Sequence, residues 1–383
     1  MKKKVLIFAP FYTPSIKGGG PIVSTKNIVE NLSDRIDFYI LTSDRDLGDN
    51  NPFEDIQYNR WNKVGNAHVQ YIDRDLITIR KLVKIMKSVK FSSFYLNSFF
   101  DYHFSILPIL AKKLNKNIKG SMVLAPRGEF SPGALQLKSI KKRIYIGFFK
   151  LFCLNKNIEW HATGETEKEY IQNIFGEKSS VQVASNLTAN YSKLSYSKDL
   201  KKEPGSAKFI FISRIHPKKN LLKALSFFGD VKGKVVFSIY GPVEDSDYWD
   251  SCQKVVKELP GNVQVEYEGI LEHDDILKKF NEYHFFLFPT LGENFGHVIS
   301  EALIGGCPVI VSDQTPWIDL EMKEVGWDIP LKDSEKYIDI IQKCINMDSE
   351  EYGKMSKNAF EFGKEKSTNQ NSIDSTYKLF DRN

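Results

Sequence analysis

The chain has 383 residues and a net charge of +5, with 42% apolar and 26% charged residues. Its length predicts two or three domains, and its composition excludes a disordered, collagen-like or disulfide-stapled protein. The net charge is too small to indicate a nucleic-acid-binding protein, so we expect no nucleic-acid partner.

The N-terminal half alternates short apolar runs with segments of helical periodicity. Strands are expected at 5–12, 37–42, 94–97, 122–125 and 159–162, and helices at 22–32, 105–114 and 166–174. A glycine loop, Lys17–Pro21, follows the first strand, and His161 in the last one is expected to be a hydrogen-bonded structural histidine. Apolar strands that alternate with helices are typical of a parallel sheet covered on both faces.

A polar segment, 185–208, separates this half from a second series of strands and helices. Strands are expected at 209–212, 235–240, 263–267, 285–289 and 309–312, and helices at 221–228, 249–259, 298–304 and 358–380. The sequence therefore predicts an α/β protein with two Rossmann-like, doubly wound domains that face a cleft, residues 1–190 and 207–365. A C-terminal helix, 366–383, could pack back on the first domain. Ligands of such sheets bind at the carboxyl ends of the strands.

The four cysteines and the two most apolar segments bear on where the protein resides. Cys153, Cys252, Cys307 and Cys344 have no metal-site spacing and lie among apolar residues, which is typical of buried thiols in a reducing compartment. The run at 5–12 is interrupted by a proline and lacks a cleavage site, so it is not a signal peptide. Residues 91–111 are too polar to span a membrane. We expect a cytoplasmic protein.

The strongest chemical pattern is the string Pro289–Leu303, which joins a predicted strand to a helix. Gly296 lets the backbone approach a ligand closely, and the amides of the following helix suit a phosphate. Glu293 and Glu301 supply carboxylates, which accept hydrogen bonds from hydroxyls. A phosphate and hydroxyls together indicate a nucleotide sugar. The alternative is an acidic first turn that favours the helix dipole.

A basic loop, Ser213–Leu221, follows the first strand of the second domain. Arg214 and Lys219 can converge on a diphosphate, the first through its planar fork and the second as a point charge. A solvated surface loop is the alternative interpretation.

These strings resemble the retaining glycosyltransferases of family 4, which have the GT-B fold, and the resemblance covers nearly the whole chain. Glu293 and Glu301 fit the Glu-x7-Glu pair, and Arg214 and Lys219 fit the Arg-x4-Lys pair. The glycine loop and the string Ser312–Trp317 fit as well. The stretch 125–135 is similar to a subgroup that builds bacterial surface polysaccharides.

The resemblance implies roles for the matching residues. Glu293 would contact the donor sugar and Glu301 the ribose, and the backbone near Ile270 would read the base. Arg214 and Lys219 would neutralise the diphosphate, and Gly19 with Gly20 would let backbone amides reach it. The implied donor site comprises Gly19, Gly20, Arg214, Lys219, Ile270, Glu293, Asn294, Phe295, Gly296, His297, Val298 and Glu301. The catalytic candidates are Glu293, Arg214, Lys219 and Arg127. Arg127 stands where many relatives have a His-containing string, and it would face the acceptor or a phosphate. For His297, a contact to the donor phosphate and a purely structural role at the start of the helix are both open.

The implied function is the retaining transfer of a sugar from a nucleotide diphosphate, expected to be UDP, to a hydroxyl of a glycan or lipid-linked glycan in cell-surface polysaccharide synthesis. We expect no cofactor and no metal, because Arg214 and Lys219 carry the positive charge that a divalent ion supplies elsewhere. Asp-x-Asp pairs at 44–46, 73–75 and 245–247 only mimic metal sites. The alternatives are a nucleotide-sugar epimerase or hydrolase on the same fold, and a non-catalytic sugar-nucleotide-binding module.

One segment is strongly basic. Between Lys112 and Lys156, eleven Lys or Arg stand against a single acid, Glu129. Within it, residues 138–156 interleave basic with apolar and aromatic side chains. A basic amphipathic helix of this kind can lie on an anionic membrane, here its inner face. The alternative is a helix that packs its Phe residues on its own domain and leaves its Lys residues in water.

Overall fold

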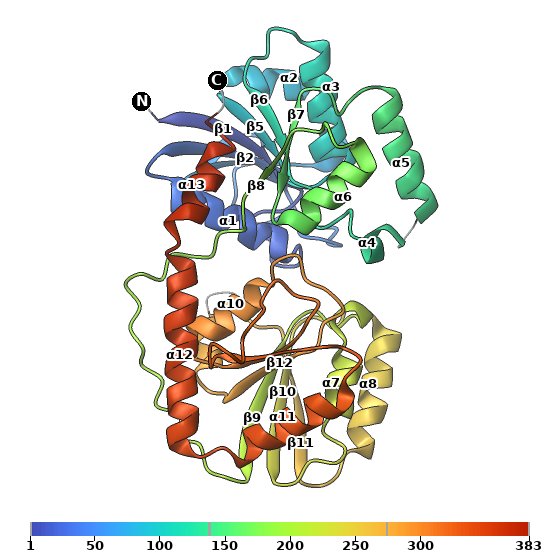
Figure 1. The fold of residues 1–383 in the computed structure, drawn as a ribbon. Helices are drawn as coiled ribbons and strands as arrows, with labels where there is room; N and C mark the ends of the chain where they lie inside the picture. The colour runs from blue at the N-terminus through green and yellow to red at the C-terminus, as the bar shows by residue number, and fades with distance from the viewer. Residues whose placement is uncertain (1, 137–138, 273–274, 382–383) are drawn as a thin grey trace. The chain divides into compact units, whose positions relative to one another are not determined.

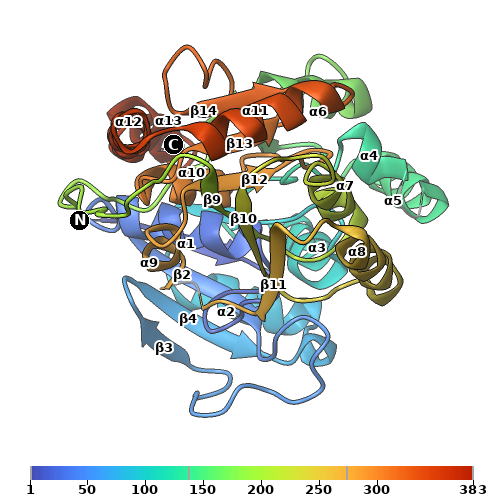
Figure 2. The same ribbon diagram turned by 90° about the horizontal axis from the view of Figure 1, so that it is seen from below.

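The structure is a computed structural model, and it describes residues 2–136, 139–272 and 275–381. Its contacts divide the chain into two compact units, Met1–Asn190 with Asn369–Asn383 (unit 1) and Tyr191–Thr368 (unit 2). Each unit has one central sheet with helices on both faces (Figure 1 and Figure 2). The predicted α/β class with two Rossmann-like domains is confirmed.

Unit 1 contains an eight-stranded sheet of order β3-β4-β2-β1-β5-β6-β7-β8, parallel except for the β3–β4 pair. Its strands are β1 (Lys3–Phe8), β2 (Ile36–Ser43), β3 (Trp61–Val64), β4 (Ala67–Ile72), β5 (Ser93–Leu96), β6 (Ser121–Leu124), β7 (Ile158–Ala162) and β8 (Val181–Val183). Strands are added on one side of β1 and then, from β5 onward, on the other. The strand order therefore reverses between β1 and β5.

The side chains of β1 alternate between two cores, as its apolar run predicts. Val5 and Ile7 belong to the core on the side of α1 (Gly20–Leu32) and α13 (Gln370–Lys378). Leu6 and Phe8 belong to the opposite core. That core also takes side chains from α2 (Ile79–Ser88), α3 (Leu107–Leu114), α5 (Ser139–Leu151) and α6 (Glu165–Phe175).

Unit 2 contains a six-stranded, fully parallel sheet of order β11-β10-β9-β12-β13-β14. Its strands are β9 (Ser206–Ile212), β10 (Lys234–Tyr240), β11 (Val263–Gly269), β12 (Phe285–Phe288), β13 (Val309–Ser312) and β14 (Gly326–Ile329). Its helices are α7 (Leu221–Ser226), α8 (Ser246–Glu258), α9 (Ile276–Phe280), α10 (His297–Ile304), α11 (Ser334–Asn346) and α12 (Ser349–Ser367). The strand order reverses between β9 and β12.

The structure departs from the sequence-based prediction in several elements. The β3–β4 hairpin, α2, β8, α11 and β14 were not anticipated, and the first strand ends at Phe8 rather than at residue 12. The tail forms two helices, α12 and α13, instead of one helix over 358–380. The break has a local cause, because the Asn369 side chain accepts a hydrogen bond from the Ser372 amide at 3.2 Å and caps α13.

Three of the four cysteines are buried, whereas Cys153 is only half-buried, and all four are free thiols. Within the described ranges, we find no helix with the length and apolar character needed to cross a membrane.

A partly buried lysine fixes the polar segment that precedes β9. Lys198 Nζ donates hydrogen bonds to the backbone carbonyls of Phe280, Tyr283 and Gly306 at 2.9, 2.6 and 3.1 Å. Burial lowers the pKa of Lys198 to about 8. The three carbonyls replace the water that the ammonium group loses, so the segment is anchored to unit 2 despite its polar composition.

Replacing Lys198 by Ala should reduce the free energy of unfolding by about 1–3 kcal/mol, because buried carbonyls then lose their donor. The melting temperature of Lys198→Ala compared with wild type measures this loss. Lys201→Ala, which removes an exposed lysine of the same segment, is the matched control. Equal melting temperatures for the two variants would show that the anchor contributes nothing.

Candidate functional site

Three loops meet at the carboxyl edge of the unit 2 sheet, after β9, β12 and β13. Strand β12 pairs with β9 on one side and with β13 on the other. Both chemical patterns of unit 2 lie on these loops, at the point where the strand order reverses. Ligands of doubly wound sheets bind at this position, so the topology brings together what the sequence separates by more than seventy residues.

Backbone hydrogen bonds hold the Glu293 loop on both sides. The Leu291 amide donates to the Lys218 carbonyl at 2.9 Å, and the Glu293 amide donates to the Gln314 carbonyl at 3.0 Å. The first bond joins the loops after β12 and β9, and the second joins those after β12 and β13. The loop geometry is therefore set by its neighbours as well as by its own sequence.

Lys219 and Glu293, predicted to act on the same donor, form an ion pair. Their side chains are only 13% and 15% exposed, and the Lys219 ammonium also lies 5.5 Å from the centre of the Phe288 ring. An ion pair that is shielded from water orients its members more firmly than a surface pair. Lys219 thus fixes the direction of the Glu293 carboxylate.

Arg214 forms an ion pair with the carboxylate of Glu244, whereas Lys219 pairs with that of Glu293. One guanidinium nitrogen lies 2.8 and 2.7 Å from the two Glu244 oxygens, and both side chains are more than a third exposed. Arg214 and Lys219 therefore lie on the same loop but are held by carboxylates from two different neighbouring loops.

Glu244 is a candidate that sequence reasoning missed. It lies between β10 and α8, and its amide donates to the Ile215 carbonyl at 3.2 Å. The strand pattern could have indicated it, because β10 lies parallel to its neighbour β9. The loop after β10 must therefore lie at the same edge of the sheet as the Arg214 loop.

The start of α10 has the backbone that the pattern predicts. Gly296 precedes the helix with φ 77° and ψ 62°, and a Cβ there would lie 2.8 Å from Cδ1 of Ile299. Only glycine suits this position. The first-turn amides of α10 consequently follow the Glu293 loop directly, and Glu301, one turn along, is 8% exposed.

The other predicted donor residues of unit 2 fall on two segments. Asn294, Phe295, His297 and Val298 lie on the loop and first turn around Gly296, whereas Ile270 follows β11, two strands away from β9. The Phe295 carbonyl accepts a hydrogen bond from the Trp317 indole at 2.6 Å, which ties in the string after β13.

A second cluster lies where the strand order of unit 1 reverses. Asn97 follows β5 and Arg127 follows β6, and Arg127 Nε donates to Asn97 Oδ1 at 2.7 Å. Asn97 donates in turn to the Thr25 hydroxyl of α1 at 2.9 Å. Arg127 has φ 55°, a left-handed conformation that is uncommon for a residue with a side chain and is often found at functional sites.

Arg127 also begins a directed chain of hydrogen bonds. Its Nη2 donates a hydrogen bond to the Tyr95 hydroxyl at 2.8 Å. The same hydroxyl lies 2.7 Å from His161 Nδ1. His161 Nε2 lies 2.8 Å from the Ala184 carbonyl, which can only accept, so Nε2 carries the proton and Nδ1 accepts from Tyr95. Burial, with a smaller effect from the Arg127 charge, lowers the pKa of His161 to about 3. His161 has the structural role predicted for it.

Asp46 shapes the glycine loop of unit 1. Its carboxylate accepts hydrogen bonds from the Ser15 hydroxyl and from the backbone amides of Ile16 and Lys17. Burial alone would raise the pKa of Asp46, but these hydrogen bonds outweigh it and hold the pKa below its usual range. A Cβ built on Gly19 or Gly20 would meet no heavy atom within 4 Å, so the backbone there is open to a ligand.

The Asp-x-Asp pairs serve local structure. Asp46 holds the glycine loop, and Asp73 and Asp245 accept backbone hydrogen bonds at the starts of a 3₁₀ turn (Arg74–Leu76) and of α8. Among the residues that the structure describes, no three His, Cys, Asp or Glu side chains are grouped to hold a metal ion. Metal independence of the reaction stays a prediction.

Comparison with known proteins assigns a family to unit 2. Residues 192–362 match the family described as Glycosyl transferases group 1, so this unit contains a glycosyl transferases group 1 domain. The predicted transferase enzyme is thereby confirmed. No curated protein matches the sequence.

Solved structures of glycosyltransferases share the fold of the whole chain. Anabaena HepE, in complex with UDP and glucose, is 15% identical with a TM-score of 0.67 over 98% of both chains. Sucrose-phosphate synthase from Thermosynechococcus elongatus is 15% identical with a TM-score of 0.65, over 99% of this chain and 98% of that one. WaaG, a glycosyltransferase involved in lipopolysaccharide biosynthesis, is 12% identical with a TM-score of 0.63 over 98% of both chains. The fold is that of GT-B glycosyltransferases.

We expect His161 to stay neutral in the folded protein well below the pKa of a free imidazole. With a folded-state pKa of about 3 against an ordinary value of 6.5, the imidazole stabilises the fold above pH 6.5 and loses that contribution as the pH falls toward 3. Ring-proton NMR shifts of His161 should not change between pH 8 and pH 5. A titration centred near pH 6.5 would contradict the buried hydrogen-bonded chain.

Proposed function

We propose that the protein is a retaining glycosyltransferase of family 4. It transfers a sugar from a UDP-linked donor to a hydroxyl of a glycan or lipid-linked glycan during cell-surface polysaccharide synthesis. The observation that carries this proposal is the cluster at the reversal point of unit 2, where Glu293, Lys219 and Arg214 share one sheet edge with the start of α10. HepE with bound UDP and glucose supports the donor class, and the biosynthetic role of WaaG supports the product class.

The donor would be held by groups of distinct chemistry. The diphosphate fits the first-turn amides of α10 and the charges of Lys219 and Arg214. Glu301 would accept hydrogen bonds from the ribose hydroxyls. The backbone near Ile270 would form hydrogen bonds with the base. Asn294, Phe295, His297 and Val298 complete the loop that surrounds the sugar and phosphates.

In the reaction, the bond between the anomeric carbon and the leaving diphosphate oxygen breaks, and a bond to the acceptor oxygen forms on the same face of the sugar. The hydroxyl proton passes to the departing diphosphate. Lys219 and Arg214 stabilise the charge that develops there, while Glu293, oriented by Lys219, positions the sugar.

Two predicted contributions come from unit 1. The open backbone of Gly19 and Gly20 supports amide contacts to the diphosphate. Arg127, with three hydrogen bonds to Asn97, Asn186 and Tyr95, is a fixed cation suited to an acceptor or phosphate. Both assignments rest on the resemblance together with these local features.

Glu293→Gln should lower turnover at least about a hundredfold, the scale of losing a transition-state contact, while UDP affinity changes little. Steady-state rates and calorimetric titration with UDP measure the two quantities. Glu282→Gln, which neutralises an exposed glutamate of unit 2, is the matched control and should retain full turnover. An equal loss of UDP binding in Glu293→Gln would instead assign Glu293 to the ribose.

Transfer should persist in EDTA, because Lys219 and Arg214 supply the positive charge at the diphosphate. The rate is measured with and without chelator, and then after addition of manganese or magnesium. Activity that disappears in EDTA and returns with the metal would disprove metal independence. Donor converted to another sugar nucleotide without acceptor would instead indicate an epimerase.

A further inference from the structure

Helix α5 packs on unit 1 through one of its faces. Phe149 is fully buried, and its ring centre lies 4.8 Å from that of Phe99. The Tyr145 hydroxyl donates a hydrogen bond to the Phe99 carbonyl at 2.8 Å. With one face packed in this way, a helix of a water-soluble domain normally turns polar side chains outward.

The outward face of α5 is apolar instead. Ile140, Ile144, Phe148 and Leu151 are 74%, 68%, 43% and 77% exposed, and Phe152, directly after the helix, is 50% exposed. At helical spacing the first four fall within roughly 80° of arc, on the side away from Phe149. We call these five residues the α5 row. Single exposed apolar residues are ordinary, but a continuous row indicates a surface that contacts something else.

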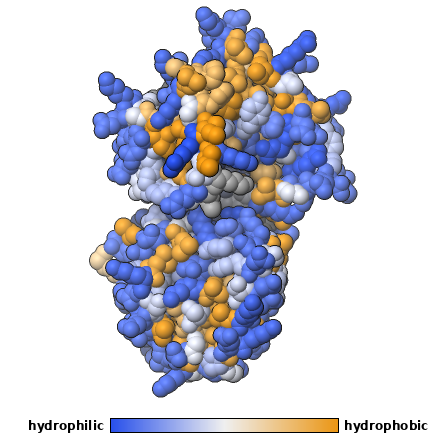
Figure 3. Space-filling view, turned by 90° about the vertical axis from the view of Figure 1, so that its right-hand side faces the viewer, coloured by the Kyte–Doolittle hydropathy of each residue, from blue (hydrophilic) through white to orange (hydrophobic). Residues whose placement is uncertain are grey.

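Basic side chains border the α5 row. Lys141 and Arg143 are exposed, and no Asp or Glu occurs between residues 139 and 156. Lys138, which was predicted to belong to this surface, lies outside the described residues. Figure 3 shows apolar patches on this side of the protein with hydrophilic side chains among them.

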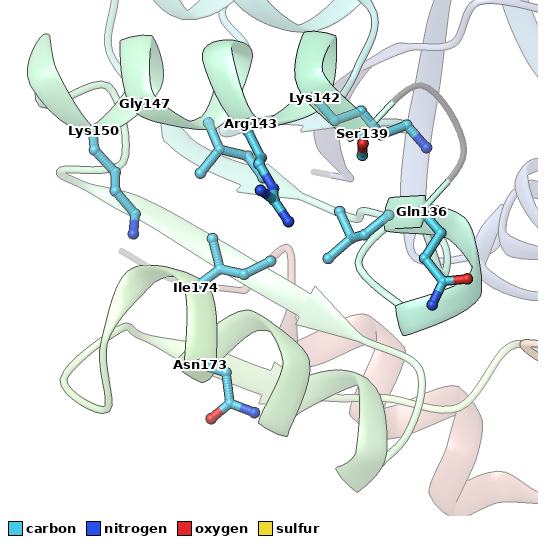
Figure 4. Close-up of a pocket in the computed structure, with 10 residues that line it drawn as sticks. Gln136, Ser139, Lys142, Arg143, Gly147, Lys150, Asn173 and Ile174 are labelled. Atoms are coloured by element: carbon cyan, nitrogen blue, oxygen red, sulfur yellow. The ribbon is translucent and has the colours of Figure 1, made fainter.

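A groove of about 610 Å³ lies beside α5, and we call it the α5 groove. Lys142, Arg143 and Lys150 contribute cations, whereas Ile146 and Ile174 are among its apolar lining. Figure 4 shows Arg143 and Lys150 extending from α5 toward α6, and Ile174 extending from α6 toward α5. The groove therefore combines positive charge with an apolar wall, directly beside the exposed row.

We propose that the α5 row and the α5 groove together dock unit 1 on an anionic lipid bilayer. The row enters the boundary between headgroups and acyl chains, and Arg143 and Lys150 bind headgroup phosphates. An outward apolar stripe flanked by Lys and Arg is the arrangement of helices that lie in a membrane interface, and positive charges at that depth add attraction to anionic lipid. The absence of acidic residues over 139–156 favours a uniformly anionic partner over a protein surface of mixed charge.

The experiment is co-sedimentation of the full chain with phosphatidylcholine vesicles that contain or lack phosphatidylglycerol. We expect wild type to bind the anionic vesicles, and the double variant Ile144→Glu, Phe148→Glu to bind them roughly tenfold or more weakly. Leu76→Glu with Met322→Glu is the matched control, because both side chains are exposed elsewhere, at 57% and 80%. The control should bind like wild type.

A second variant tests the basic part of the surface. Arg143→Gln with Lys150→Gln should lower the affinity for anionic vesicles roughly tenfold or more, and leave any weak binding to pure phosphatidylcholine unchanged. Raised salt should weaken wild-type binding in the same direction, because it screens the attraction.

Three results would overturn the proposal. The first is that wild type does not bind anionic vesicles, and the second is that the double variant Ile144→Glu, Phe148→Glu binds them as well as wild type. The third is that the chain forms a dimer which this variant abolishes, while vesicle binding is absent. The last result would make the row an interface between two copies. UDP binding by each variant shows whether the donor site of the proposed function is intact, and its melting temperature shows whether it is folded. A change in vesicle binding can therefore be told apart from failure of the proposed function and from loss of folding.

Discussion

The pairing of β12 with β9 is the constraint on which the donor site depends. These strands are about seventy residues apart in the sequence, and their pairing places the Arg214 and Lys219 loop beside the Glu293 loop. The strand order reverses at this pair, and the start of α10 follows the Glu293 loop directly. The ion pair of Lys219 with Glu293 and the bond from the Leu291 amide to Lys218 depend on the same pairing.

Unit 1 repeats the arrangement with different chemistry. Its strand order reverses between β1 and β5, and Arg127, which follows β6, bonds there to Asn97, which follows β5. Here the cation is held by neutral partners, Asn97, Asn186 and Tyr95. In unit 2 the two cations are held by carboxylates. The carboxylates of Glu293 and Glu244 balance the charges of Lys219 and Arg214, whereas the partners of Arg127 leave its positive charge uncompensated by these contacts.

Much of the fold could be predicted from the sequence because the sheet strands are buried on both faces. Runs such as Phe209–Ile212 are apolar throughout, and only such strands give this signal. The edge strand β3 gives none, because Trp61–Val64 is only partly buried and its residues alternate without a clear apolar face. The division of the tail into α12 and α13 depends on one cap, Asn369, which apolar periodicity does not reveal.

For the site, the sequence indicated the loops but not the partners within them. Glu293 and Lys219 were predicted from local patterns, yet their ion pair requires the β9–β12 pairing. Glu244 was missed because its loop, Gly241–Asp245, has no distinctive motif, and only the order of the strands places it near Arg214. The basic amphipathic helix at 138–156 was predicted from the sequence, but only burial tells which of its apolar side chains are packed and which form the exposed row of α5.

Hydrogen exchange with and without UDP shows most directly whether the donor binds at the β9 and β12 loops, because it reports on the protein residue by residue. We expect slower exchange on UDP binding for the amides of 213–220 and 289–298, on the loops after β9 and β12 and in the first turn of α10. UDP binding that leaves both of these segments unprotected, or no UDP binding at all, would contradict it.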